Sequence, residues 1–137
     1  MAVVEELIRK EEDGTLSFGN FELTSKSKLS DFEYEGDLYK IKTFQEITKL
    51  ERNGMFVYES VPGTTVTNMN CKEEGITFYV EGKEDAQVTL ELEAEKEYDV
   101  RISGRDSGVM KSNLGCKLSI SVELNVGEPV EIAVTAK

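Results

Sequence analysis

The segment Cys116-Lys117-Leu118-Ser119-Ile120-Ser121-Val122-Glu123-Leu124 alternates apolar and polar side chains without a break. Successive side chains of a β-strand point to opposite faces, so this pattern predicts a strand with one buried face and one face in water. Turn residues lie on both sides of it, Asn113-Leu114-Gly115 before and Asn125-Val126-Gly127 after. The segment therefore predicts one strand of an antiparallel sheet.

Shorter runs with the same alternation occupy the rest of the C-terminal half. Their apolar positions are Ile76, Phe78 and Val80; Val88, Leu90 and Leu92; Tyr98, Val100 and Ile102; and Val130, Ile132 and Val134. Short strands that follow one another every 8 to 12 residues or so, with turns between them, are typical of a sandwich. We therefore expect a mainly all-β protein in which residues 64–137 form an antiparallel β-sandwich of the immunoglobulin-like or fibronectin-III-like type.

Two turn signals divide the N-terminal part into hairpins. Asp13-Gly14 separates residues 5–12 from 15–23, although the apolar residues at 4, 7 and 8 also have helical spacing. Glu35-Gly36-Asp37 joins residues 32–34 to 38–41. A tight turn at Val61-Pro62-Gly63-Thr64, of type II with Gly63 at positive φ, marks the boundary. We expect residues 1–63 to form a hairpin unit packed on the sandwich.

Residues 43–54 fit two structures. Thr43 and Glu46 have the spacing of a capping box, and Asn53-Gly54 could end one short helix. The same Asn53-Gly54 is a strong type I′ turn signal between two strands. The hairpin is favoured, because residues 55–58 predict a strand that needs a neighbour.

Composition limits the partners of the chain. The 137 residues include 16 Lys and Arg against 27 Asp and Glu, which gives a formal net charge of −11. Such a surface repels nucleic acids and anionic lipids. The sequence has neither an apolar stretch near the roughly 20 residues that a membrane span needs nor a secretory signal pattern at its start. We expect a cytoplasmic protein that binds neither nucleic acid nor membrane.

The residue types also limit the chemistry. The chain has no histidine, so Ser-His and Cys-His nucleophile pairs are excluded, and it has no phosphate-binding glycine motif. Cys71 and Cys116 are 45 residues apart without a metal-ligand spacing, and they are interpreted as reduced apolar residues rather than a disulfide. We expect no enzyme activity, no cofactor and no metal site.

Five residues are candidates for binding. Tyr34 and Tyr39 belong to an aromatic cluster that fits either a core or a ligand platform. Tyr58 lies beside Glu59, which is either a solvent-facing strand residue or a carboxylate at a site. Arg105 and Asp106 put opposite charges on the expected loop 104–108, where they either pair with each other or contact a partner.

Three segments resemble a known family: residues 47–64, 97–100 and 113–119. They are similar to short, uncharacterised all-β proteins of anaerobic Gram-positive bacteria, some of which carry the label endosialidase. The resemblance covers nearly the whole chain and rests on turn and strand patterns. It implies an all-β fold and, through the label, a role with carbohydrates. The chain has only four arginines and no tryptophan, whereas sialidases use several arginines around the sugar carboxylate and tryptophan-containing repeats.

Taken together, these patterns predict a non-catalytic binding or assembly protein. Exposed sheet edges or an exposed face can contact another protein or a second copy of the chain in a homodimer. The alternative is an accessory carbohydrate-binding or carbohydrate-processing protein.

Overall fold

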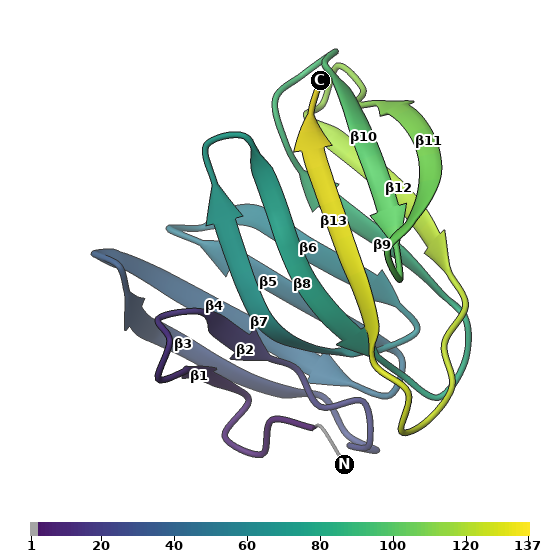
Figure 1. The fold of residues 1–137 in the computed structure, drawn as a ribbon. Coiled ribbons are helices and arrows are strands. Elements are labelled where there is room, and N and C mark those ends of the chain that lie inside the picture. Colours follow the sequence, from purple (N-terminus) through teal and green to yellow (C-terminus); the bar gives the residue numbers. More distant parts are fainter. Residues whose placement is uncertain (1–2) are drawn as a thin grey trace.

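The computed structural model describes residues 3–137, which form thirteen β-strands and no helix. One sheet contains, in spatial order, β1 (Ile8–Lys10), β2 (Leu16–Phe18), β7 (Thr65–Lys72), β8 (Gly75–Glu81), β13 (Val130–Ala136), β10 (Glu97–Ile102) and β11 (Arg105–Lys111). The other contains β12 (Lys117–Val122), β9 (Ala86–Glu91), β6 (Met55–Val61), β5 (Ile47–Arg52), β4 (Asp37–Phe44) and β3 (Ser27–Tyr34). The two sheets face each other (Figure 1), so the prediction of an antiparallel β-sandwich is confirmed.

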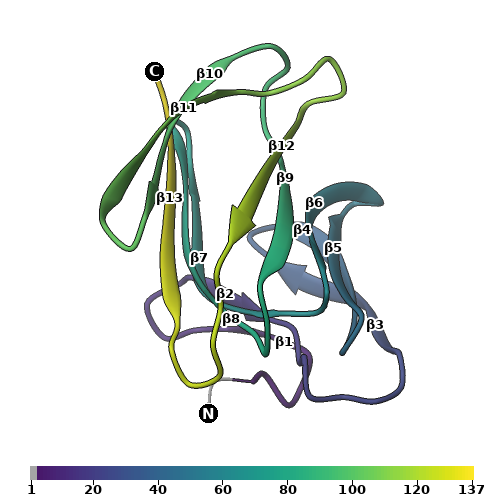
Figure 2. The ribbon, with the colours of Figure 1, turned by 90° about the vertical axis from the view of Figure 1, so that its right-hand side faces the viewer.

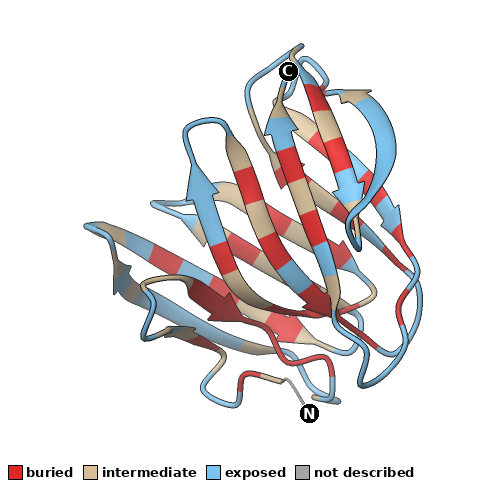
Figure 3. Ribbon diagram, viewed as in Figure 1, coloured by how far each residue is buried: buried red, intermediate tan, exposed pale blue. Residues whose placement is uncertain are grey.

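The alternation in the sequence becomes the burial pattern of the strands. Figure 3 shows buried and more exposed residues taking turns along β8, β13 and β10. Leu118, Ile120 and Val122 of β12 are buried, whereas Ser119 and Ser121 are exposed. The apolar faces of both sheets therefore form one core, and the polar faces lie outside.

Tyr58 stands at the centre of this core. Its ring makes edge-to-face contacts with Phe18 and Phe78 of the opposite sheet, with centroids 5.3 and 5.8 Å apart. Its hydroxyl lies 2.7 Å from the Thr64 Oγ1, which is also 2.7 Å from the Ser60 Oγ. A buried tyrosine needs such a partner for its hydroxyl. This expected binding residue is therefore a core residue, with no exposed surface.

The expected boundary between residues 63 and 64 does not separate two cores. Strand β2 lies before the boundary and pairs with β7 after it, through Leu16 with Met69 and Phe18 with Val66. Strand β6 pairs with β9 in the same way in the other sheet. The described part of 1–63 therefore supplies strands to both sheets, instead of packing on a sandwich made by 64–137 alone.

The turn at Gly63 differs from the expectation. The Val61–Pro62 peptide bond is cis, and Gly63 does not have a positive φ. A Cβ atom at Gly63 would lie 1.9 Å from the Phe44 carbonyl oxygen. Glycine is required here because the neighbouring backbone is too close for any side chain.

The ambiguous residues 43–54 form the hairpin. Strand β5 is joined to β6 by Asn53 and Gly54, whose φ angles are 52° and 79°. Positive φ at both positions is what a type I′ turn requires. Pairing with β4 and β6 on either side of β5 replaces the helix that the capping residues also allowed.

Candidate interaction edge and inter-sheet cleft

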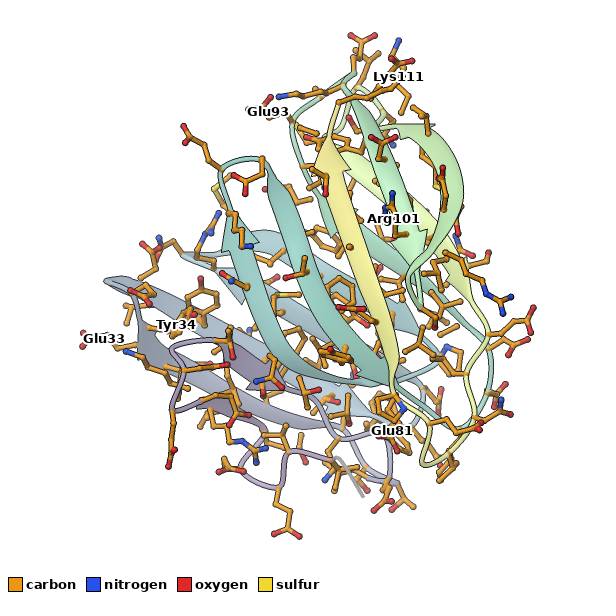
Figure 4. All side chains as sticks on the ribbon, in the orientation of Figure 1. Glu33, Tyr34, Glu81, Glu93, Arg101 and Lys111 are labelled. Carbon is orange, nitrogen blue, oxygen red and sulfur yellow. The ribbon has the colours of Figure 1, made fainter. Side chains whose placement is uncertain are left out.

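Tyr34 and Tyr39 come together at one end of the sandwich. Their rings meet edge to face, with centroids 5.6 Å apart, and the Tyr34 hydroxyl donates a hydrogen bond to the Gly14 carbonyl oxygen at 2.6 Å. Figure 4 labels Tyr34 at this end of β3. Both side chains line a hollow of about 240 Å³ between the sheets, together with polar residues that include Asp37, Asn70 and Arg52.

Arg52 extends this hollow into a longer cleft. It lies opposite Tyr39 in the β4–β5 register and also lines a second hollow of about 320 Å³, which shares Val57 and Cys71 with the first. Within residues 3–137, Arg52 has no carboxylate oxygen within 4.0 Å. Burial raises the pKa of Tyr39, and the guanidinium of Arg52 acts in the opposite direction. The cleft therefore presents a neutral phenol beside an unpaired cation.

Cys71 stands at the mouth of the cleft. The residue is exposed and not bonded to Cys116, yet the protein around its thiol raises the pKa of that group, an effect that Arg52 only partly opposes. A raised pKa keeps the sulfur protonated and unreactive at neutral pH. Among residues 3–137, no three His, Cys, Asp or Glu side chains form a group that could hold a metal ion.

Arg105 and Asp106 do not lie in a loop. They begin β11, because Ser103 and Gly104 alone make the turn after β10. Both are exposed, and the Asp106 Oδ1 accepts a hydrogen bond from the Gly108 amide at 2.8 Å. Asp106 therefore shapes its own strand, and neither residue joins the tyrosines at the cleft.

Three of the four sheet edges are interrupted or short. On β3, the register shifts between Leu29 and Phe32, and Asp31 has a φ of 60°. On β11, the register shifts opposite Asp99 and Arg101, and Gly108 has a φ of 98°. Strand β1 is three residues long. Bulges and short strands are the usual protection of an edge against pairing with another chain.

The fourth edge, β12, is regular. All six of its residues pair with β9 without a register shift. Figure 2 looks onto this side of the molecule, with β12 in front of β9 and the β10–β11 hairpin standing apart from it. Its exposed face is uncharged over Ser119 and Ser121, whose hydroxyls are hydrogen-bonded to Thr89 and Gln87 of β9.

The hydrogen bonds at the start of β12 show which of its backbone groups face outward. The Leu92 amide donates to the Cys116 carbonyl at 2.8 Å, so Cys116 faces β9. Alternate residues face opposite edges, so Lys117, Ser119 and Ser121 point their backbone groups away from β9. Asn113 pairs with both backbone groups of Lys117: its amide donates to the Lys117 carbonyl oxygen at 2.9 Å, and its Oδ1 accepts from the Lys117 amide at 3.0 Å. Within the described chain, the outward amides and carbonyls of Ser119 and Ser121 have no partner.

The sequence predicted β12 as a strand but not as an edge. Edge position depends on the order of strands in the sheet. Strand β12 pairs only with β9, and the two strands between them in the sequence, β10 and β11, belong to the other sheet. The only feature of the local sequence that fits an edge position is the pair of serines, Ser119 and Ser121, on the outer face of the strand. Arg52 and Cys71 were not predicted as cleft residues either. Arg52 lies beside Tyr39 through the β4–β5 pairing, whereas Cys71 of β7 reaches the tyrosines only through the packing of the two sheets.

Comparisons with known proteins found no match to a family model, to a curated protein or to a solved structure. In residues 3–137, nothing helical has the length and apolar character that a membrane crossing requires.

Proposed function

We propose that this chain is a non-catalytic binding or assembly protein that takes up an extended strand of a protein partner along β12. The partner strand adds to the six-stranded sheet by bonding the outward backbone groups of Ser119 and Ser121. The observation that carries the proposal is the contrast among edges, since β12 alone of the four is both regular and longer than three residues. Strand addition draws its affinity from such unpaired backbone groups.

The uncharged outer face of β12 supports the same function. Charged side chains on an edge strand oppose pairing, and β3 carries Lys28, Asp31 and Glu33. On β12 the two positions that would meet a partner carry serines, with Lys117 only at the strand start. The pairing segment is short, so we expect a moderate affinity that depends on protein concentration.

Photo-crosslinking from the two edges tests this proposal. Benzoylphenylalanine replaces Ser119 in one variant and Ser107 of β11, also exposed, in the matched control. Irradiation in an extract of the native host should crosslink residue 119 to a defined peptide of another protein or of a second copy, and residue 107 to none. Equal crosslinking from both positions, or none from residue 119, would overturn the proposal.

A second candidate function is binding of a carbohydrate in the cleft. Its support is the meeting of Tyr34 and Tyr39 with Asp37, Asn70 and Arg52 around one hollow, which combines aromatic surface with hydrogen-bonding groups. Screening the protein against a panel of neutral and acidic oligosaccharides tests it. A hit should be lost in Arg52→Ala and kept in Arg101→Ala, which changes an exposed arginine of β10 (Figure 4). Equal loss in both variants would contradict a site in the cleft.

A further inference from the structure

Three lysines stand directly opposite one another across three strands of the six-stranded sheet. Lys28 of β3 pairs with Lys42 of β4, and Lys42 pairs with Lys49 of β5. Like charges at directly opposite positions repel each other and weaken a sheet. The arrangement is unexpected in a chain with 27 acidic residues and a net charge of −11. We call Lys28, Lys40, Lys42 and Lys49 the lysine face.

Within the described chain, only one of these lysines forms an ion pair within 4.0 Å, and the carboxylate of that pair, Glu51, also lies opposite Lys40 in the β4–β5 register. The Lys49 Nζ lies 3.6 Å from the Glu51 Oε2, whereas no carboxylate oxygen of residues 3–137 lies within 4.0 Å of the other three. The four lysines and Glu51 surround a shallow hollow of about 70 Å³. The hollow is therefore a local excess of positive charge on an acidic protein.

Apolar side chains flank the lysine face. Phe44 lies two residues after Lys42 and Ile47 lies two residues before Lys49, so both are on the same outer face. Phe44 and Ile47 oppose each other in the β4–β5 register and are half-buried, and the Lys26 Nζ lies 6.0 Å from the centre of the Phe44 ring. The surface thus offers a partner both positive charge and apolar area, so electrostatic complementarity and apolar packing can act together there.

Acidic residues limit the extent of this surface. Glu59 of β6 opposes Lys49, and Asp31 and Glu33 follow Lys28 along β3. A long polyanion such as DNA would pass from the lysines onto these carboxylates and be repelled there. A short segment with two or three negative charges fits within the limits.

We propose that the lysine face binds a short acidic segment of a protein partner, in which carboxylates contact the lysines and an apolar side chain packs on Phe44 and Ile47. This surface is separate from β12, at the other edge of the same sheet, so it adds a second contact and does not rest on the strand-addition proposal. The charge pattern of the lysine face selects acidic partners and favours their encounter with it.

A fluorescein-labelled peptide of repeated Glu-Glu-Leu units provides the test, with binding followed by fluorescence anisotropy at low salt. Lys42→Glu should weaken binding by roughly tenfold, because it turns the central attraction into a repulsion. Lys111→Glu makes the same charge change at the exposed end of β11 (Figure 4) and should leave binding within about twofold. Lys40→Glu gives a second reversal on the face if Lys42→Glu fails to fold.

Two further measurements separate the chemistry of the site. Ile47→Ser should weaken binding of the leucine-containing peptide and leave that of an all-glutamate peptide unchanged. Ser121→Pro, which blocks the β12 edge, should leave the binding of both peptides unchanged. Equal weakening by Lys42→Glu and Lys111→Glu, no binding of the peptide by the unaltered protein, or equally tight binding of single-stranded DNA would overturn the proposal.

Discussion

Strands β11 and β12 follow each other in the chain and lie on the same side of the molecule as the outermost strands of opposite sheets (Figure 2). Strand β11 is exposed along nearly its whole length and is broken by a bulge at Gly108. Strand β12 buries every second side chain and keeps a regular register. The comparison teaches that an exposed edge strand can depart from regular pairing, whereas an edge strand whose alternate side chains belong to the core is held in register.

The largest difference between the two strands should be in stability. Ile120→Ala on β12 removes a side chain that is 1% exposed, and we expect it to lower the free energy of unfolding by about 2–5 kcal/mol. Val109→Ala on β11, where the side chain is 46% exposed, should cost less than about 0.5 kcal/mol. Urea unfolding of both variants measures this, and equal losses would contradict the comparison.

The bulge of β11 provides the next effect. Gly108 has a φ of 98° and open space around its Cβ position, so Gly108→Val meets no steric obstacle except its own backbone. We expect a loss of about 1–2 kcal/mol from the strained backbone conformation. Ser107→Val on the same exposed strand is the control and should stay within about 0.5 kcal/mol. A Gly108→Val variant as stable as the unaltered chain would contradict the need for glycine at the bulge of β11.

The short β1 edge should respond to pH through Glu11. The Glu11 Oε2 accepts hydrogen bonds from the buried Ser17 hydroxyl, at 2.5 Å, and from the Arg9 Nε, at 2.9 Å. The Ser17 bond, with help from Arg9, lowers the pKa of Glu11 below its usual value. A carboxyl whose pKa is lower in the folded state stabilises that state above its unfolded pKa, and this contribution is lost as the pH falls through the folded pKa.

Glu11→Gln removes that contribution. At neutral pH the variant should be less stable than the unaltered chain by about 1 kcal/mol, and the difference should shrink on acidification to about pH 3. Unfolding by urea at both pH values provides the measurement. A difference that grows on acidification would contradict the role of the Glu11 carboxylate.

A small effect on stability, with a large effect on binding, is expected for Ser121→Pro. The Ser121 amide faces away from β9, so proline removes no bond of the sheet and should cost less than about 1 kcal/mol. The same change should abolish the crosslink formed from residue 119. Retention of that crosslink in a folded Ser121→Pro variant would exclude the proposed pairing.

These edges also show what the sequence can predict. The alternation of residues 116–124 predicted the strand and its buried face at 117–122, although Cys116 belongs to the preceding turn, because side-chain direction in a strand is a local property. The turn at Asn53-Gly54 was equally local, since positive φ at both residues selects the hairpin. Features set by two or three neighbouring residues were therefore predictable.

Features that depend on the order of the strands in the sheets could not be predicted from the sequence. Tyr58 was expected at a binding site and is instead packed against Phe18 and Phe78, which come from distant parts of the chain. Strand β2 pairs with β7 across the boundary expected at residue 63, which the local turn signal could not indicate. Tyr34 and Tyr39 were predicted, and the structure brings them together, but Arg52 joins them through the β4–β5 register and Cys71 through the packing of the opposite sheet. The immunoglobulin-like or fibronectin-III-like subtype stays a prediction.

Residue-resolved amide hydrogen exchange tests the role of β12 most directly. In the crosslink-defined assembly, the outward amides of Ser119 and Ser121 should exchange slowly, and dilution to the separate chain should restore fast exchange, whereas the exposed amides of β11 should stay fast throughout. Fast exchange at Ser119 and Ser121 within the assembly would contradict strand addition at this edge.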